Sequence, residues 1–298
     1  MNKLLFISPF FTLFLGLKFR QKYAIIDTTI EGGIRMGNKG YGYIPSPKDI
    51  RNYKISKTKK EIDLPDSFQV EHSHIKDQGE VGSCVAHGIS EVLETNDGIN
   101  YSTGWIYGYR PDNYYQGEGM IPSEALKTIT KVGYLENKDL DVNIEMVAAK
   151  HIVEGQFEYY IEKASEKKAL SYAALNNVRE IKEAIYKGKK PIVLCINIGA
   201  DGLQLDKDYI AFIPSEYIGG HLVVCYGWNE KGLLIQNSWG NKWGCYGTFI
   251  LPYEYPIEEA WVIKMAEPED NELEIVKPNC YKVRELLMLI LKLLRKRR

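Results

Sequence analysis

Cys84 is a candidate nucleophile because of the place in the sequence at which it occurs. Cysteine attacks as a thiolate, so a catalytic cysteine needs a pKa below its ordinary value. The N-terminus of a helix favours the thiolate, because free N–H groups and the helix dipole stabilise negative charge there. From residue 83 to about residue 95, apolar residues recur at the spacing of one helical face. The sequence therefore predicts a helix with Ser83 as its N-cap and Cys84 in its first turn.

A protonated histidine beside the thiol is the second influence that lowers the pKa of a catalytic cysteine. His87 follows Cys84 by three residues and would lie beside it on the same helix. We expect His87 to be a packing residue. The histidine partner must then come from elsewhere in the chain.

The elements around this helix divide the chain into a helical half and a β half. A second helix is predicted from residue 122 to about 131, and residues 141–187, rich in Ala, Glu, Lys and Tyr, are expected to be mostly helical. After Gly188 the pattern changes to short apolar, β-branched runs at residues 191–198, 222–226, 233–236 and 248–251. Segregated elements predict an α+β protein of two lobes, with a site in the cleft between them.

Composition narrows the function. The chain has 298 residues, 26% of them charged, and a formal net charge of −1, which gives no indication of a nucleic-acid partner. The five cysteines are widely spaced without a CxxC pair, which argues against a zinc site and a disulfide framework. We expect no metal or organic cofactor, and cysteine usage favours a reducing, cytoplasmic compartment.

Three segments resemble the papain and cathepsin family of cysteine peptidases. Residues 78–86 (QGEVGSCVA) resemble the family's Q-G-x-C-G-S-C-W-A signature, and residues 219–223 (GGHLV) its histidine segment. Residues 237–244 (NSWGNKWG) match its N-S-W-G-x-x-W-G segment. A weaker likeness extends from Leu64 to about Trp261. The resemblance implies the papain-like fold, with a helical lobe, an antiparallel, barrel-like β lobe and the active site between them.

The resemblance also implies roles for individual residues. Cys84 resembles the nucleophile, and His221 resembles the general base and acid that keeps it ionised and then protonates the leaving amine. Asn237 resembles the residue that orients the imidazole without adding charge. Gln78 resembles the side-chain donor of the oxyanion hole, which the backbone N–H of Cys84 completes. Trp239 and Trp243 are expected to shield the bond between His221 and Asn237 from water.

The substrate-binding positions follow from the same resemblance. Gly119 corresponds to exposed backbone that binds substrate as an added extended strand, although Glu118 departs from the family's Gly-Gly pair. Gly220 is expected to leave the main specificity pocket with an open, uncharged floor, and Cys195 to lie on another wall of it. Val81 stands where many relatives have a disulfide cysteine, so the chain resembles bacterial or viral members that lack disulfides.

Three domains are expected. Residues 1–63 form an N-terminal segment, which would be a short propeptide or an integral arm. Residues 64–265 form the papain-like catalytic domain, with its helical lobe at about 64–187 and its β lobe at about 188–265. Residues 266–298 form an acidic linker and a basic amphipathic helix, which could contact a membrane surface, a protein partner or the chain's own domain. The apolar run at residues 4–17 resembles the core of a signal peptide, so export is the alternative to the cytoplasm.

The function expected from these residues is hydrolysis of peptide bonds by a thiol protease, an endopeptidase, that forms a thioester on Cys84. The expected partner is a polypeptide substrate, and the protein is expected to be a monomer. Two alternatives use the same residues: a cysteine transpeptidase, or an amidase acting on cell-wall peptides. A third is a papain-fold binding module without catalysis, with the C-terminal helix as its docking element.

Overall fold

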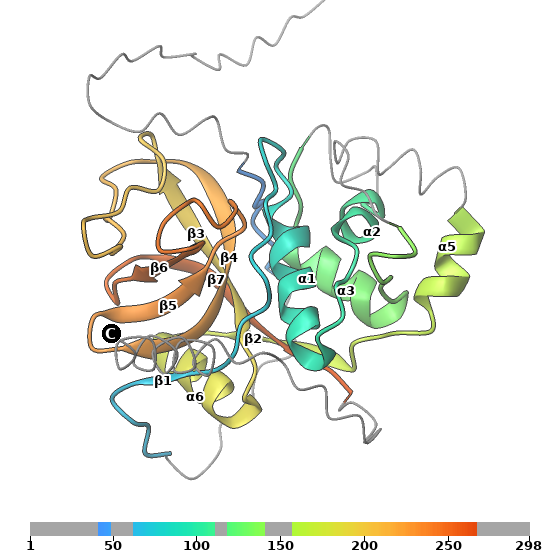
Figure 1. Cartoon of the computed structure of the whole chain (residues 1–298), viewed down its shortest axis with the longest axis horizontal. Coiled ribbons are helices and arrows are strands. Elements are labelled where there is room, and N and C mark those ends of the chain that lie inside the picture. Colours follow the sequence, from blue (N-terminus) through green and yellow to red (C-terminus); the bar gives the residue numbers. More distant parts are fainter. Residues whose placement is uncertain (1–40, 49–61, 111–117, 141–156, 267–298) are drawn as a thin grey trace, which may run out of the picture. The chain divides into compact units, whose positions relative to one another are not determined.

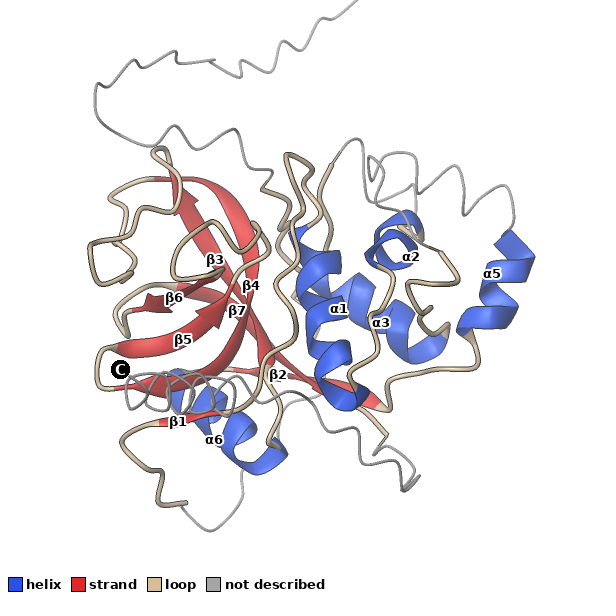
Figure 2. Ribbon diagram, viewed as in Figure 1, coloured by secondary structure: helices blue, strands red, loops and turns tan. Residues whose placement is uncertain are grey.

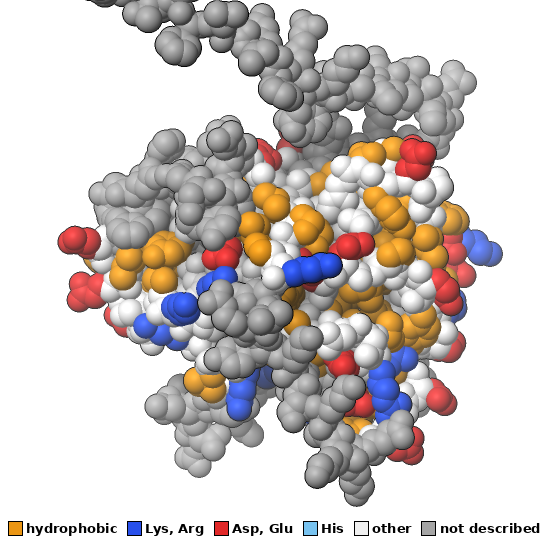
Figure 3. All heavy atoms as spheres, turned by 180° about the vertical axis from the view of Figure 1, so that it is seen from behind, with side chains coloured by type: hydrophobic (Ala, Val, Ile, Leu, Met, Phe, Trp, Pro, Cys, Tyr) orange, Lys and Arg blue, Asp and Glu red, His pale blue; other side chains and the backbone are white. Residues whose placement is uncertain are grey.

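The computed structural model describes residues 41–48, 62–110, 118–140 and 157–266, all of which belong to the compact unit formed by residues 37–298. The apolar run at residues 4–17 and the basic helix expected near the C-terminus lie outside the described residues. Within the described ranges, no helix is long and apolar enough to cross a membrane. Charged side chains of both signs lie among apolar ones on the face shown in Figure 3.

Four helices form one side of the described structure (Figures 1 and 2): α1 (Cys84–Asp97), α2 (Thr103–Gly108), α3 (Pro122–Lys131) and α5 (Phe157–Ala164). The predicted helices at residues 83–95 and 122–131 correspond to α1 and α3. Pro122 begins α3, where its missing N–H costs no helical hydrogen bond. Gly98 ends α1 with a left-handed conformation, φ 77°, which glycine adopts without steric cost.

An antiparallel sheet of seven strands forms the other side. Its strands are β1 (Phe68–Gln69), β2 (Ser171–Leu175), β3 (Ile192–Gly199), β4 (Tyr217–Asn229), β5 (Gly232–Gln236), β6 (Thr248–Leu251) and β7 (Ile257–Lys264). The order is β2-β7-β3-β4-β5-β6, and β1 pairs with β4. The four predicted β runs lie within or next to β3, β4, β5 and β6. The central β3 is buried along nearly its whole length, as its continuous apolar pattern indicates.

One part of the helical expectation was wrong. Residues 171–175 form β2, which pairs with β7 from Ser171↔Lys264 to Leu175↔Ala260, in a range expected to be mostly helical. The following helix, α6 (Val178–Gly188), contacts β3 and β4. Asn177 caps this helix by accepting the N–H of Glu180. The β side of the structure therefore begins before Gly188, because β2 is part of the sheet and α6 packs on it.

Two apolar cores hold the fold together. One lies between the helices and the near face of the sheet, where α1 packs on β4 through residues such as Ile89, Leu222 and Val224. The other lies within the sheet and against α6, and includes Ile185, Trp228 and Phe249. Because α1 and β4 pack directly on each other, their contact sets the distance between Cys84 at the start of α1 and His221 in β4.

Candidate active site

The Cys84 thiol is fully buried at the N-terminus of α1. Its sulfur accepts the backbone N–H of Leu222 at 3.4 Å. Burial raises the pKa of Cys84 to about 11, while the N–H groups of Leu222, Gly42, Val85 and Cys84 itself act in the opposite direction. Desolvation therefore outweighs the helix N-terminus in this structure.

His221 comes from β4 and is also fully buried. Its Nε2 lies 2.8 Å from Oδ1 of Asn237, which also accepts the backbone N–H of Ser238 at 2.8 Å. Burial lowers the pKa of His221 to about 4, against the effect of Asn237. Nδ1 has no hydrogen-bond partner among the described residues. Asn237 thus fixes the ring and leaves the other nitrogen available.

Cys84 and His221 are brought to one place but are not directly bonded. Leu222, whose N–H meets the sulfur, is the residue after His221. In the part of the chain that the structure describes, no hydrogen bond joins the thiol to the imidazole. Burial thus shifts the two pKa values toward the neutral thiol and the neutral imidazole, the direction opposite to that of an ion pair.

Aromatic rings, among them those of Trp239 and Trp243, lie around His221. Trp239 stacks on His221 with ring centroids 4.6 Å apart and an interplanar angle of 29°. Trp243 meets Trp239 edge-on at 5.0 Å. Tyr41 stands edge-on to His221 at 6.3 Å. The arrangement keeps water away from the imidazole, which strengthens its hydrogen bond to Asn237.

Gln78 is buried beside the same loop. Its Oε1 accepts the hydroxyl of Ser238 at 2.6 Å, and its backbone N–H donates to the carbonyl of Ser238 at 2.9 Å. Its Nε2 donates to the carbonyl of Val81 at 2.8 Å, in the loop that leads to Cys84. The amide is therefore held between the two loops that carry Cys84 and Asn237.

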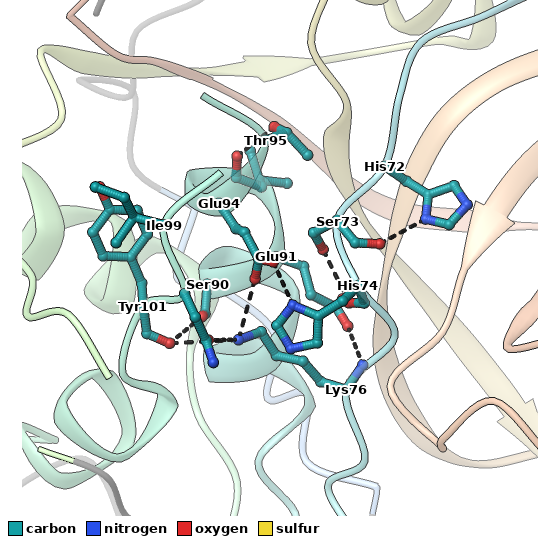
Figure 4. A network of polar contacts seen from close by, with 12 residues as sticks. His72, Ser73, His74, Lys76, Ser90, Glu91, Glu94, Thr95, Ile99 and Tyr101 are labelled. Carbon is teal, nitrogen blue, oxygen red and sulfur yellow. Dashed lines mark hydrogen bonds and ion pairs between the residues drawn. The ribbon is translucent and has the colours of Figure 1, made fainter. Parts of the chain in front are cut away.

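A buried polar network holds the segment before Gln78 against α1 (Figure 4). Lys76 donates from Nζ to Oδ1 of Asn100 at 2.6 Å and forms an ion pair with Glu94 at 3.5 Å. His74 also contacts Glu94. On the other side, the carbonyl of Lys76 accepts the N–H of Gly240, two residues beyond Ser238. The network thus joins α1 to the loop that holds Asn237.

The residues expected to bind substrate lie on both sides of the structure: Gly119 on the helical side, and Gly220 and Cys195 in the sheet. Gly119 has a backbone φ of 108°, which residues other than glycine rarely adopt, and it precedes Met120 at the edge of the helical side. Gly220 and Cys195 lie in neighbouring strands of the sheet. Glu118, which departs from the family pattern, accepts the N–H of Gly82 at 2.7 Å. It thereby ties the Gly119 segment to the loop before Cys84.

Residues 41–46, hereafter the strap, lie between the Gly119 segment and β4. Met120 donates its N–H to the carbonyl of Gly42 at 2.7 Å, and Ile44 donates to the carbonyl of Met120 at 3.0 Å. Across the cleft, Tyr43 donates to the carbonyl of Gly220 at 3.1 Å. Gly42 packs so closely that a Cβ there would lie 1.8 Å from the carbonyl oxygen of Gly82. The strap is thus paired as an added strand and covers the thiol.

Tyr43 fills the pocket beside the thiol. A Cβ at Gly220 would lie 2.2 Å from Cδ1 of Tyr43, so the missing side chain makes room for the ring. The Tyr43 hydroxyl donates to Oε1 of Glu259 in β7 at 2.9 Å, and the same oxygen accepts the N–H of Ser46 at 2.6 Å. The side chain of Glu259, which sequence reasoning did not predict here, thus lies at the end of the Tyr43 ring.

Sequence reasoning did not identify Glu259 as part of the site. It placed Glu118 beside the substrate-binding Gly119, and it expected a short propeptide or an integral arm in residues 1–63 without singling out residues 41–46. Among the described residues, no group of three or more His, Cys, Asp or Glu side chains could hold a metal ion. His87 packs as expected, with Nδ1 3.0 Å from the carbonyl of Ser83.

Comparisons with known proteins agree on the family and the fold. The model of the papain family cysteine protease matches residues 59–259. An uncharacterized peptidase C1-like protein of Acanthamoeba polyphaga mimivirus is 28% identical, over 66% of this chain and 72% of that protein. Cysteine proteinase 3 of Entamoeba histolytica is 25% identical, over 59% of this chain and 58% of that protein.

Solved structures support the fold independently. Xylellain, a cysteine protease from Xylella fastidiosa, has a TM-score of 0.62 and 23% identity, and the match covers 80% of this chain and 100% of that one. Procathepsin B from Trypanosoma congolense has a TM-score of 0.57 and 14% identity, over 77% of this chain and 87% of that one. The expected α+β papain-like fold is confirmed.

Proposed function

Because the chain belongs to the papain family of cysteine proteases, we propose that it is an endopeptidase that hydrolyses polypeptides through a thioester on Cys84. The observation that carries the proposal is the 2.8 Å hydrogen bond between Nε2 of His221 and Oδ1 of Asn237, which leaves Nδ1 available, while the next residue, Leu222, contacts the sulfur of Cys84. The α1 N-terminus supports a thiolate once water can enter.

The proposed reaction has two steps. In the first, Nδ1 of His221 takes the thiol proton, the sulfur of Cys84 attacks the scissile carbonyl carbon, and the backbone N–H of Cys84 with the amide of Gln78 stabilises the oxyanion. The C–N bond then breaks as His221 gives its proton to the leaving amine. In the second, His221 deprotonates a water molecule, which attacks the thioester and releases the carboxylic acid and the thiol.

We also propose that the strap holds the enzyme inactive. It covers the thiol and pairs with Met120 and Gly220, where an extended substrate would bind. The thiol faces the N–H of Gly42, while the carbonyl of Gly42 accepts from Met120. The strap meets the sulfur with an N–H group, and we infer that it blocks the site without being a substrate there. Displacement of the strap is then the activating step.

Turnover of fluorogenic peptide amides tests the proposal. We expect activity in reducing buffer from the chain that begins at residue 62, more than from the full chain, and none from Cys84→Ala in either. Cys225→Ala is the matched control, because Cys225 is also fully buried but lies in the second core, away from the cleft. Activity that survives Cys84→Ala would refute the proposal.

The molecule that accepts the acyl group from the thioester distinguishes hydrolysis from peptide transfer. Product masses with and without an added amino-acid amide show which nucleophile resolves the thioester. We expect the free acid as the main product at millimolar amine, because the proposed second step uses water. A dominant amide-linked product would instead establish a transpeptidase that uses the same Cys84 chemistry.

A further inference from the structure

We propose that Glu91 is a positioning residue, which joins α1 to the loops that carry Gln78 and Asn237 and so keeps the active site in register. The inference rests on the proposed peptidase function and adds to it a residue that touches no substrate. The observations that carry it are the burial of the Glu91 carboxyl and its contacts with two other segments of the chain.

Glu91 lies inside the molecule on the helix that begins with Cys84. Its side chain is 1% exposed, and it follows Cys84 by seven residues, so the two lie on the same face of α1. The proposed reaction uses no carboxyl group at this place. Because a buried carboxyl is unfavourable unless polar partners replace its water, the contacts of Glu91 show what the carboxyl does.

The first contact is with the segment before Gln78, and Figure 4 shows Glu91 beside this segment. Oε1 of Glu91 accepts the backbone N–H of Lys76 at 3.4 Å. On its other side, the carbonyl of Lys76 accepts the N–H of Gly240 at 2.9 Å, and the N–H of Gln78 donates to the carbonyl of Ser238 at 2.9 Å. Glu91 therefore holds the segment that pairs with the loop after β5.

The second contact is with Gln236, the last residue of β5, which directly precedes Asn237. The side chain of Gln236 is fully buried and forms a hydrogen bond with the Glu91 carboxyl. Its Nε2 also donates to the carbonyl of His74 at 3.1 Å. Glu91 thus contacts both of the segments that pair with each other in the active site, while its own helix carries the nucleophile.

The charges around Glu91 allow its effect on activity to be separated from its effect on folding. Burial raises the pKa of Glu91 to about 8, against the effect of Lys76. Lys76 also forms an ion pair with Glu94 at 3.5 Å, so its ammonium keeps a partner when Glu91 is replaced. A leucine at residue 91 removes a costly buried carboxyl, which offsets the N–H of Lys76 that it leaves unpaired. We therefore expect stability to change little.

The experiment compares Glu91→Leu and Glu91→Gln in the full chain carrying Tyr43→Ala, in which we expect the strap to be open. Glutamine keeps an oxygen for the N–H of Lys76, whereas leucine keeps only the volume. Ser102→Ala is the matched control, because Ser102 is also 1% exposed and also has two partners. It donates to the carbonyl of Leu140 at 2.7 Å and accepts the N–H of Trp105 at 3.0 Å, both on the helical side.

The readouts are kcat and KM for a peptide amide, the urea midpoint, and hydrogen exchange at the N–H groups of Gln78 and Gly240. We expect Glu91→Leu to lower kcat about 10- to 100-fold, the effect of a small misplacement of catalytic groups, with KM within about twofold. Exchange at both N–H groups should become faster, and Glu91→Gln should recover most of kcat. Ser102→Ala should shift the urea midpoint and leave kcat and this exchange unchanged.

A second variant reaches the same contact from the sheet. Gln236→Leu removes the bond to Glu91 from β5 and should lower kcat in the same way, so the inference stays testable if Glu91→Leu does not fold. A kcat that neither variant lowers, or losses that follow the urea midpoints of all variants including Ser102→Ala, would overturn the inference and leave the peptidase function intact. No turnover by the parent chain, with no labelling of Cys84 by a peptidyl vinyl sulfone, would instead overturn the proposed function.

Discussion

Tyr43→Ala should release the strap and expose Cys84. The side chain is 7% exposed and its contacts are made with the sheet, so its removal weakens the closed state. Truncation of a buried aromatic ring to alanine costs about 3–5 kcal/mol. At 1.36 kcal/mol for each factor of ten, the open fraction should increase by a factor between about 100 and several thousand. The gain levels off once most molecules are open.

The assay is the rate at which iodoacetamide alkylates Cys84 in the full chain, followed by mass spectrometry of the peptide that contains it. Tyr43→Phe keeps the ring and loses only the bond to Glu259, so we expect an increase of about 10- to 100-fold. Tyr159→Ala is the control, because that ring is 57% exposed on α5. A wild-type rate for Tyr43→Ala would refute the idea that the strap gates the thiol.

Three further predictions follow from the site. Burial, to which the strap contributes, lowers the pKa of His221 to about 4, below its ordinary 6.5, so the closed strap is favoured above pH 6.5 and becomes less favoured as the pH falls toward 4; hydrogen exchange of the strap, corrected for its intrinsic rate, should rise on acidification, and constant protection would contradict this. Lys76→Met leaves the buried Glu94 without its ammonium partner and should lower the free energy of unfolding by about 3–5 kcal/mol; an unchanged urea midpoint would count against it. Gly220→Ala places a Cβ 2.2 Å from Tyr43 and should speed alkylation of Cys84, and a rate equal to wild type would show that the strap accommodates it.

The sequence predicted those helices whose signals lie within the helix itself. The helical periodicity after Ser83 and the proline at residue 122 identified α1 and α3. The strand at residues 171–175 was missed because SYAAL has little β-branched character. It becomes a strand by pairing with β7, which is about 90 residues further along the chain. No signal within residues 141–187 could have indicated that pairing.

Some residues of the candidate site could likewise be predicted from the sequence, and others could not. Cys84, His221 and Asn237 lie in short segments with a recognisable order of residue types, so the sequence alone could nominate them. Glu259 lies in an ordinary strand, and its contact with Tyr43 joins residues 216 positions apart. The burial that shifts the pKa values of the thiol and the imidazole could not be predicted either, because it depends on how distant segments, the strap among them, pack around the two residues.

The most direct test of the central claim is to trap the acyl group on the enzyme. A peptide ester is mixed with the Tyr43→Ala chain, quenched in acid within milliseconds and analysed by intact and peptide mass. The account predicts one acyl group, on the peptide that contains Cys84, that hydroxylamine removes and that Asn237→Ala forms more slowly. Steady turnover with no acyl group on Cys84, or with the acyl group on another cysteine such as Cys245, would contradict it.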